Sequence, residues 1–186
     1  MISDKELVRK CLEQDPAAQE LLYRRFASKM LGVCLRYARD RMEAEDILQD
    51  GFVKVFNKLV DFRGDGSLEG WVRRIMVNSA INAYHSNLKY LQNIEIENAK
   101  LGDSGLSDFN ALDSISVEEM LKLVQELPEG YRIVFNMYAI EGYSHKEIGG
   151  MLNITESTSK SQLSRARVTL QKKLLKLNPL IYEKTA

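Results

Sequence analysis

Apolar residues recur along this chain at steps of three and four, and this spacing decides its fold class. One series is Leu22, Phe26, Met30, Val33 and Tyr37, which share one face if the segment is an α-helix. No Val-, Ile- or Thr-rich segment of alternating polarity lies between Asn-Gly or Asp-Gly turns, so strands are not expected. The sequence therefore predicts an all-α protein.

Residues with capping side chains mark where the helices should begin. Ser3-Asp4-Lys5-Glu6 has the order of a capping box, and Asp15 stands before a first-turn proline. Asp40 should open a third helix, and Ser67 should cap a fourth that runs to about Tyr90. Four more helices are expected at about 116–126, 128–140, 144–152 and 155–177.

The segment between these two groups of helices has a different composition. From about Asn93 to Asp113 it is rich in Gly, Ser, Asn and Asp and lacks helical spacing of apolar residues, which is typical of a linker. A chain of 186 residues has room for one large or two small domains. We therefore expect two small helical domains, at 1–92 and 114–186, joined by a flexible linker at 93–113.

Charge is balanced over the whole chain but not within every segment. The 26 Lys and Arg residues equal the 26 Asp and Glu residues, which excludes a wholly basic nucleic-acid binder. Between residues 157 and 178, however, six basic residues occur with no acidic residue, so this segment can meet a phosphate backbone. An ordinary solvated helix face is the alternative, although such a face usually includes acids.

The sequence gives no sign of catalysis, metal binding or a membrane segment. The two histidines fall in different predicted domains, and no Ser-His-Asp set, HExxH motif, P-loop or GxGxxG motif occurs. Cys11 and Cys34 are too few for a disulfide framework or a cysteine-rich metal site. No apolar run approaches the ~20 residues of a membrane span, and the N-terminus lacks the order of a secretion signal. We expect no enzyme activity, cofactor, metal site or membrane insertion, and a cytoplasmic location.

The C-terminal part has the pattern of a helix-turn-helix. Ser144 should cap a short helix, Asn153-Ile154-Thr155 should form a tight turn, and a long helix follows. Basic groups, hydroxyls and an amide at the start of that helix suit contacts with phosphates and base edges in a major groove. The residues that it would present are Ser157, Thr158, Lys160, Ser161, Gln162, Ser164 and Arg165.

Two polar faces in the N-terminal part are not needed for folding. Asp46, Gln49 and Asp50 share the side of the third helix opposite its apolar stripe, and they form either a solvated surface or a contact site. The fourth helix carries an aromatic ring, a guanidinium and two amides on one face, with no acidic residue between 69 and 95, which suits melted or single-stranded nucleic acid. These residues are Trp71, Arg74, Asn78 and Asn82. Trp71 would equally fit the core.

Taken together, these motifs resemble the bacterial sigma-70 family of RNA polymerase sigma factors. Region 2 of that family is similar to Ala44–Phe52, Phe62–Asp65 and Trp71–Asn78. Region 4 is similar to Leu127–Arg132, Tyr143–Ile148 and Ser161–Arg167. The length and the two-domain plan resemble the extracytoplasmic-function (ECF) subgroup, which keeps only these two regions.

The resemblance implies a role for each set of residues. Asp46, Gln49 and Asp50 fall where the family docks on the clamp helices of the polymerase β′ subunit, and the β flap is the other part of core polymerase that the resemblance implies as a partner. The loop from Phe62 to Ser67 falls where a flipped base of the −10 promoter element is captured, and the helix-turn-helix residues fall where the −35 element is read. The implied −10 set is Phe62, Arg63, Trp71, Arg74, Asn78 and Asn82. Core RNA polymerase, promoter DNA and an anti-sigma factor are the expected partners.

This chain departs from the family pattern at three places. Asn82 stands where Asp is frequent, Gly149 where Ala is frequent, and Ser157–Gln162 where Gly-Thr-Val-Lys-Ser-Arg is usual. Gln162 stands where the family usually has a basic residue. We expect this difference to affect which promoter sequences are preferred, and not whether the chain binds DNA. A polymerase-independent helix-turn-helix regulator is the alternative function. It would need a dimer interface or a ligand domain, and it leaves both N-terminal faces unexplained.

Overall fold

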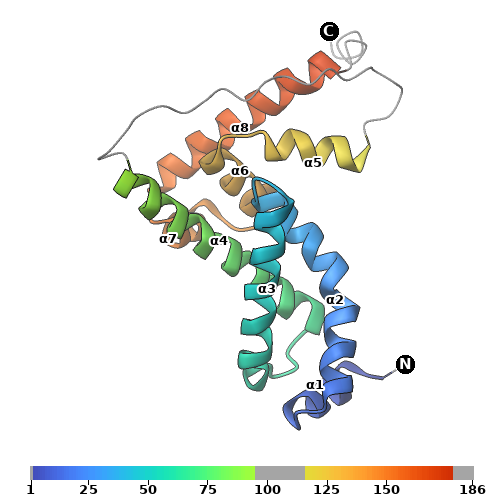
Figure 1. Ribbon diagram of the computed structural model, residues 1–186. Coiled ribbons are helices and arrows are strands. Elements are labelled where there is room, and N and C mark those ends of the chain that lie inside the picture. Colours follow the sequence, from blue (N-terminus) through green and yellow to red (C-terminus); the bar gives the residue numbers. More distant parts are fainter. Residues whose placement is uncertain (1, 95–115, 178–186) are drawn as a thin grey trace. The chain divides into compact units, whose positions relative to one another are not determined.

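The computed structural model describes residues 2–94 and 116–177 (Figure 1). These two ranges contain helices and short connections but no strand, which confirms the all-α prediction. By its contacts the chain divides into two compact units, Met1–Ala83 and Tyr84–Ala186. The domain limits expected from the sequence stay a prediction, and most of the expected linker, 95–113, lies outside the described residues. None of the helices in the described ranges is long and apolar enough to cross a bilayer.

The first unit is built from three helices and most of a fourth. The elements are α1 (Asp4–Leu12), α2 (Pro16–Tyr37), α3 (Arg41–Lys58), the 3₁₀ turn η1 (Leu59–Asp61) and α4 (Leu68–Ile94). The carboxylate of Asp40 accepts a hydrogen bond from the Glu43 N–H at 2.9 Å, and the hydroxyl of Ser67 accepts one from the Gly70 N–H at 3.0 Å. These are the caps predicted for α3 and α4. The fourth helix continues beyond its expected end to Ile94.

The first predicted capping box is only half formed. The Ser3 hydroxyl accepts a hydrogen bond from the Glu6 N–H at 3.3 Å. The Glu6 carboxylate instead pairs with the Arg9 guanidinium at 2.7 Å, one helical turn further along α1. A charged partner on the same helix thus takes the carboxylate that would have bonded back to the cap.

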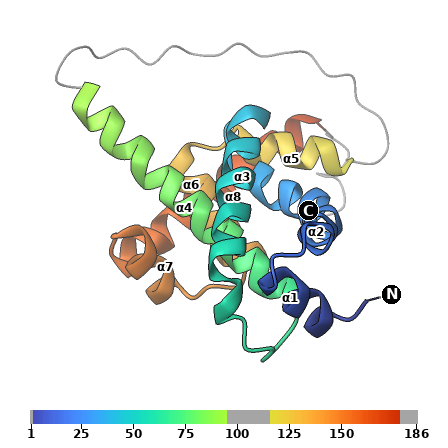
Figure 2. The same ribbon diagram turned by 60° about the horizontal axis from the view of Figure 1, so that its bottom comes forward.

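The core of the first unit is made of the apolar stripes expected from the sequence. The stripe of α2 is buried at all five positions: Leu22, Phe26, Met30, Val33 and Tyr37. The stripe of α3 and its following turn is buried as well: Ala44, Leu48, Phe52, Val55 and Leu59. Figure 2 shows α3 crossing α4. The two helices approach closely at Gly51, where a Cβ atom would lie 2.2 Å from the sulfur of the buried Met76.

The second unit contains the last part of α4 and four further helices. The elements after α4 are α5 (Val117–Gln125), α6 (Glu129–Phe135), the π-helical segment η2 (Asn136–Ile140), α7 (His145–Leu152) and α8 (Glu156–Leu177). The single helix expected at 128–140 is therefore α-helical only in its first half. The side-chain amide of Asn136 donates to the Arg132 carbonyl at 2.9 Å, and the Glu141 N–H reaches the Asn136 carbonyl at 3.0 Å. A side chain that competes for a backbone carbonyl gives a local reason for the wider turn.

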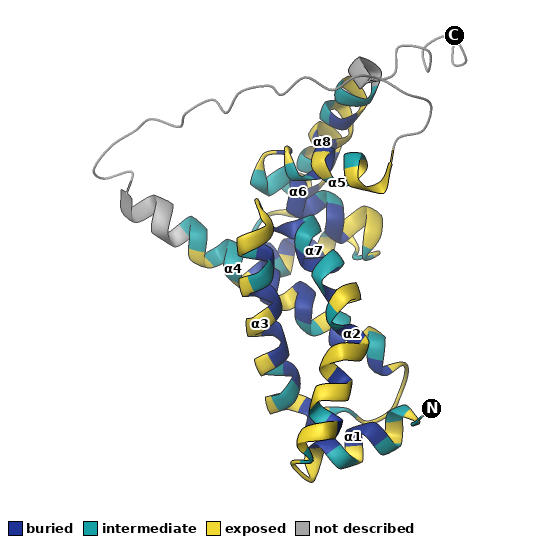
Figure 3. Cartoon of the chain, turned by 45° about the vertical axis from the view of Figure 1, so that its right-hand side comes forward, coloured by how far each residue is buried: buried dark blue, intermediate teal, exposed yellow. Residues whose placement is uncertain are grey.

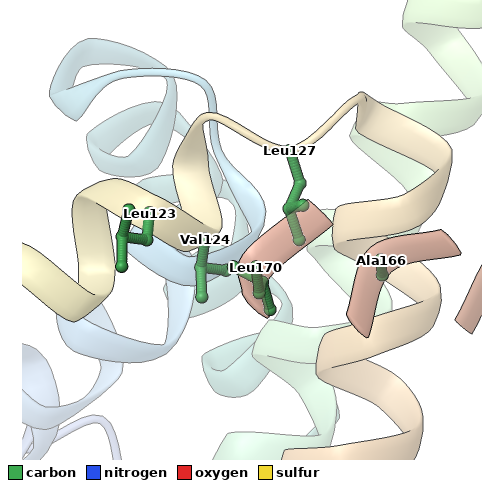
Figure 4. Packing of buried hydrophobic residues seen from close by; sticks show 5 residues of the cluster. All are labelled: Leu123, Val124, Leu127, Ala166 and Leu170. Atoms are coloured by element: carbon green, nitrogen blue, oxygen red, sulfur yellow. The ribbon is translucent and has the colours of Figure 1, made fainter. Parts of the chain in front are cut away.

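Helices α5, α6 and α7 each pack against α8. Figure 4 shows Leu123, Val124, Leu127, Ala166 and Leu170 meeting in one cluster, and all five are buried. The cluster joins α5 and the connection after it to the inner face of α8. The long helix is thereby fixed to the rest of its unit by apolar contact, and its other side remains available for polar residues.

Two residues allow the turn between α7 and α8 to be tight: one has a left-handed backbone, and the other is a glycine at a close contact. Asn153 ends α7 in the left-handed conformation, with φ of 55°. Gly149 is packed so closely that a Cβ atom there would lie 2.9 Å from the Ile154 carbonyl oxygen. The neighbouring Gly150 has no atom within 4 Å of the equivalent position. Gly149, which departs from the family pattern, therefore makes room for the turn, whereas Gly150 only weakens the helix.

This difference predicts opposite effects for two alanine substitutions in α7. Gly150→Ala should raise the free energy of unfolding by about 1 kcal/mol, because alanine is the better helix former and meets no neighbour. Gly149→Ala should lower the melting temperature, because the new methyl group would push against the Ile154 carbonyl. Thermal and urea unfolding of the two variants measures both effects. Equal stabilisation by both substitutions would contradict this account of the turn.

Candidate nucleic-acid and protein interfaces

The side of α3 that faces away from the core carries the predicted acidic set. Asp46, Gln49 and Asp50 are exposed, whereas Ile47 and Leu48 between them are buried. Figure 3 shows exposed and buried residues alternating along this helix. No hydrogen bond or ion pair links the three side chains to other residues in the described ranges. Two carboxylates and an amide are thus held on a rigid helix and remain available to a partner with basic groups.

A short loop precedes α4 and depends on two glycines. Gly64 and Gly66 have φ values of 78° and 135°, which residues with a side chain rarely adopt. The chain therefore turns sharply between η1 and the Ser67 cap. The rings of Phe62 and Trp71 meet across this turn, with centroids 5.6 Å apart and planes inclined at 58°.

The loop and the first turns of α4 together surround a small surface hollow. It is lined by Asp61, Phe62, Arg63, Asp65, Gly66, Ser67, Gly70, Trp71 and Arg74. Four residues of the predicted −10 set are among these: Phe62, Arg63, Trp71 and Arg74. Aromatic rings beside guanidinium groups suit stacking of a base and contact with its phosphate. The loop from Phe62 to Ser67, which includes Asp65, was expected at this place, whereas Asp61 and Gly70 were not among the predicted residues.

The other two residues of the predicted −10 set lie further along the same helix. Asn78 and Asn82 are exposed, and neither lines the hollow. The opposite side of α4 is buried at Met76, Val77 and Ile81. Spacings of three and four residues carry the polar face of α4 from Trp71 to Asn82.

Side-chain contacts that were not predicted from the sequence hold the helices of the helix-turn-helix together. Ser159 is fully buried, and its hydroxyl lies 2.9 Å from Nδ1 of His145. The His145 ring stacks on Tyr138 at 4.4 Å, and the guanidinium of Arg167 lies 5.8 Å from the centre of the same tyrosine ring. These contacts join α7, η2 and α8, so the start of α8 is fixed relative to the helices that carry it.

Most of the predicted −35 set is presented to solvent. The exposed members are Ser157, Lys160, Ser161, Ser164 and Arg165. Thr158 and Gln162 are only half-buried, and both have contacts inside the protein. The Thr158 hydroxyl lies 2.8 Å from that of Thr155, and a Cβ atom at Gly130 would lie 3.3 Å from the Gln162 amide nitrogen.

Two basic members of this set have partners in their own unit. Lys160 forms an ion pair with Glu156 at 2.7 Å, and its hydrogen bond and positive charge lower the pKa of that carboxyl. The Arg165 guanidinium donates to the Tyr131 hydroxyl at 3.4 Å. Five N–H donors on the guanidinium leave others for DNA. The spacing of Glu156 and Lys160 indicates their pairing, whereas the Tyr131 contact depends on the fold.

The described residues contain no cluster suited to a metal ion or to thiol chemistry. No group of three or more His, Cys, Asp or Glu side chains within those ranges could hold a metal. Burial raises the pKa of the Cys34 thiol to about 12, so it stays protonated at neutral pH. Both cysteines are buried.

Two family models match this chain, one in its N-terminal half and one in its C-terminal half. A model described as Sigma-70 region 2 matches residues 22–89, and one described as Sigma-70, region 4 matches residues 117–170. The first covers most of α2, all of α3 and most of α4. The second covers α5, α6, α7 and the first part of α8. The two matches together cover more than half of the chain.

Similar proteins extend over nearly the same length. The RNA polymerase sigma-H factor of Pseudomonas aeruginosa is 29% identical over 189 residues, which cover 97% of this chain and 96% of that protein. The ECF RNA polymerase sigma-E factor of Escherichia coli is 27% identical over 190 residues, covering 97% of each. The sigma factor RpoE from Bartonella quintana, solved in complex with the anti-sigma factor NepR, has the same fold. It aligns with a TM-score of 0.50 and 20% identity over 91% of this chain and 99% of that one.

The carboxylate of Glu156 should oppose contact between the start of α8 and a phosphate backbone. Glu156→Gln removes one negative charge and releases Lys160, so affinity for duplex DNA should rise about two- to five-fold at low salt. Glu126→Gln is the matched control, because it removes one carboxylate whose ion pair with Lys173 lies further along α8. Fluorescence anisotropy on a labelled duplex measures both, and equal effects would contradict a special role for the start of α8.

Proposed function

The chain belongs to the sigma-70 family as an ECF-type sigma factor, and we propose that it binds core RNA polymerase, recognises promoters and opens their DNA. The observation that carries the proposal is the order of the two matches. The region 2 match covers most of the first compact unit and ends six residues inside the second, the region 4 match lies within the second, and each unit presents an exposed polar face. A polymerase-independent regulator that binds DNA through one helix-turn-helix would not need both regions.

Polymerase binding is assigned to the first unit. The carboxylates of Asp46 and Asp50, with the Gln49 amide between them, would contact basic residues on the clamp helices of the β′ subunit. Their exposure and freedom from partners in the described ranges support this role, because nothing in the fold has to be broken for them to bind. The second unit would meet the β flap, the other part of core polymerase that the family resemblance implies as a partner.

Reading and melting of the −10 element is assigned to the hollow and the polar face of α4. Phe62, Trp71 and Arg74 would hold a base that has left the stack. The Asn78 amide both donates and accepts hydrogen bonds, so it can pair with the free edge of a neighbouring base. Asn82 would extend this contact by one helical turn.

Reading of the −35 element is assigned to the start of α8. Lys160, Ser164 and Arg165 are exposed on one side of a helix whose opposite side is buried. A helix held in this way fits the major groove of intact duplex, where arginine and lysine contact guanine edges and phosphates. Thr158 and Gln162 would support the helix as well as touch DNA, because both already contact their own unit.

Regulation and location follow from the same proposal. An anti-sigma factor would bind this chain, as NepR binds the sigma factor RpoE in the solved complex. The protein would work in the cytoplasm, where core polymerase and DNA are found. Its role is recognition rather than catalysis, and no residue is assigned to a chemical step.

Dependence on core polymerase tests the proposal and separates it from the polymerase-independent alternative. The free chain has zero net charge and one modest basic segment, so it should bind duplex DNA weakly and with little sequence preference. With core polymerase it should form a salt-resistant complex on a subset of promoters and start transcripts there. Filter binding and run-off transcription on a promoter library measure this. Tight promoter binding by the chain alone, unchanged by core enzyme, would contradict it.

A further inference from the structure

The first turn of α6 lies against the part of α8 that carries the predicted −35 set. Leu127, just before α6, and Ala166 of α8 meet in one buried apolar cluster (Figure 4). The half-buried ring of Tyr131, on the first turn of α6, packs against the same cluster. Apolar contact therefore fixes this turn of α6 beside the part of α8 around Ala166, where Gln162 and Arg165 are found.

Tyr131 supplies a neutral partner for Arg165. Its hydroxyl accepts a hydrogen bond from Nη1 of the exposed guanidinium at 3.4 Å. Lys160, in the same predicted set, is instead paired with the carboxylate of Glu156. A hydroxyl restrains a guanidinium without cancelling its charge, and the other N–H donors of the group remain free to bond a base edge or a phosphate. Arg165 is thus restrained on one side and stays available to DNA.

Gly130 leaves room for a second member of the set. A Cβ atom at this position would lie 3.3 Å from the amide nitrogen of Gln162 and 3.6 Å from its amide carbon. The half-buried Gln162 side chain therefore lies against the Gly130 backbone. Gln162 and Arg165 are three positions apart on α8, so they share one side of that helix. Two consecutive residues of α6 thus touch two members of the predicted −35 set.

Contacts of this kind affect base preference more than overall affinity. A long side chain that reads a base loses rotamer freedom when it binds, and a neighbour that already restrains it lowers that cost. Bidentate contact with a guanine edge also requires a correctly directed guanidinium, whereas attraction to phosphates depends on its charge. Loss of the restraint should therefore reduce discrimination between bases and leave non-specific attraction to DNA nearly unchanged.

We infer that Gly130 and Tyr131 are positioning residues for promoter recognition. From α6, without contacting DNA, they set the directions of Gln162 and Arg165 and thereby the −35 preference of this chain. The inference rests on the proposed function and deepens it, because it makes part of the base preference a property of a helix that does not enter the groove.

Tyr131→Phe is the first test variant, because it keeps the ring in the apolar cluster and removes only the hydroxyl. Tyr138→Phe is its matched control. Tyr138 is an exposed tyrosine of the same unit, and it too has an arginine beside it. The guanidinium of Arg167, however, lies over the Tyr138 ring at 5.8 Å, and the Tyr138 hydroxyl has no hydrogen-bond partner within residues 2–94 and 116–177.

Binding of each full-length variant together with core RNA polymerase is measured on promoters that carry every single-base change in the −35 element. Arg165→Ala identifies the base pair that Arg165 reads. Tyr131→Phe should lower discrimination at that base pair about two- to five-fold, as expected for one lost hydrogen bond, and leave the other −35 positions unchanged. Added to Arg165→Ala it should have no further effect, because it acts only through the arginine. Tyr138→Phe should match wild type.

Gly130→Ala tests the second contact. The added methyl group would displace the Gln162 amide, so this variant should alter discrimination at the base pair that Gln162→Ala also alters. Added to Gln162→Ala it should change nothing more. Gly150→Ala is the matched control, because a Cβ atom there has no neighbour within 4 Å. Thermal unfolding confirms that each variant is folded.

The outcomes separate failure of the inference from failure of the proposed function. If Arg165→Ala relaxes the −35 preference while Tyr131→Phe or Gly130→Ala leaves it as in wild type, the inference is wrong for that residue and the proposed function stands. An equal loss of affinity for all promoters would also overturn the inference, because a merely structural residue has that effect. If the wild-type chain with core polymerase shows no −35 preference, the proposed function is wrong and the inference falls with it.

Discussion

Burial of one apolar stripe on each helix is the constraint on which the rest of this structure depends. Val55 on α3, Val72 on α4 and Ala166 on α8 are fully buried, and complete burial of a valine contributes about 1.5–3 kcal/mol. Once one side of a helix is committed to the core, its opposite side is fixed in direction. The acidic set of α3, the polar face of α4 and the exposed members of the predicted −35 set of α8 each lie on such an opposite side. The proposed binding surfaces therefore lie where folding fixes their direction without using their side chains.

Glycines at close contacts and one buried polar contact determine the direction in which these surfaces face. Gly51 lets α3 approach α4 over Met76, and Gly149 lets the turn before α8 close on Ile154. The buried hydroxyl of Ser159, which lies 2.9 Å from Nδ1 of His145, fixes the first turns of α8. This polar contact holds the exposed residues of the predicted −35 set in place, although Ser159 itself is buried.

Local signals in the sequence were sufficient for the helices, their caps and their buried faces. Apolar spacing predicted the stripe of α2, and Ser67 and Ser144 cap the helices expected of them. What the sequence could not predict depends on contacts that apolar spacing does not signal. The π-helical segment η2 follows from the Asn136 amide bonding the Arg132 carbonyl four residues earlier, and the partner of Arg165, Tyr131, is 34 positions away in the chain. The hollow before α4 likewise forms only when Phe62 folds back onto Trp71.

The central claim is that the two units read DNA in different states: melted strand at α4 and intact duplex at α8. A comparison of Asn78→Ala with Arg165→Ala on one promoter, by permanganate footprinting and a panel of sequence variants with core polymerase, tests it most directly. Asn78→Ala should damage opening and relax preference in the −10 element only. Arg165→Ala should weaken initial binding and −35 preference, by about 1–3 kcal/mol for a lost bidentate contact, and a pre-melted template should not restore that preference. If both substitutions shift preference within the same element, the division of labour between the units is wrong.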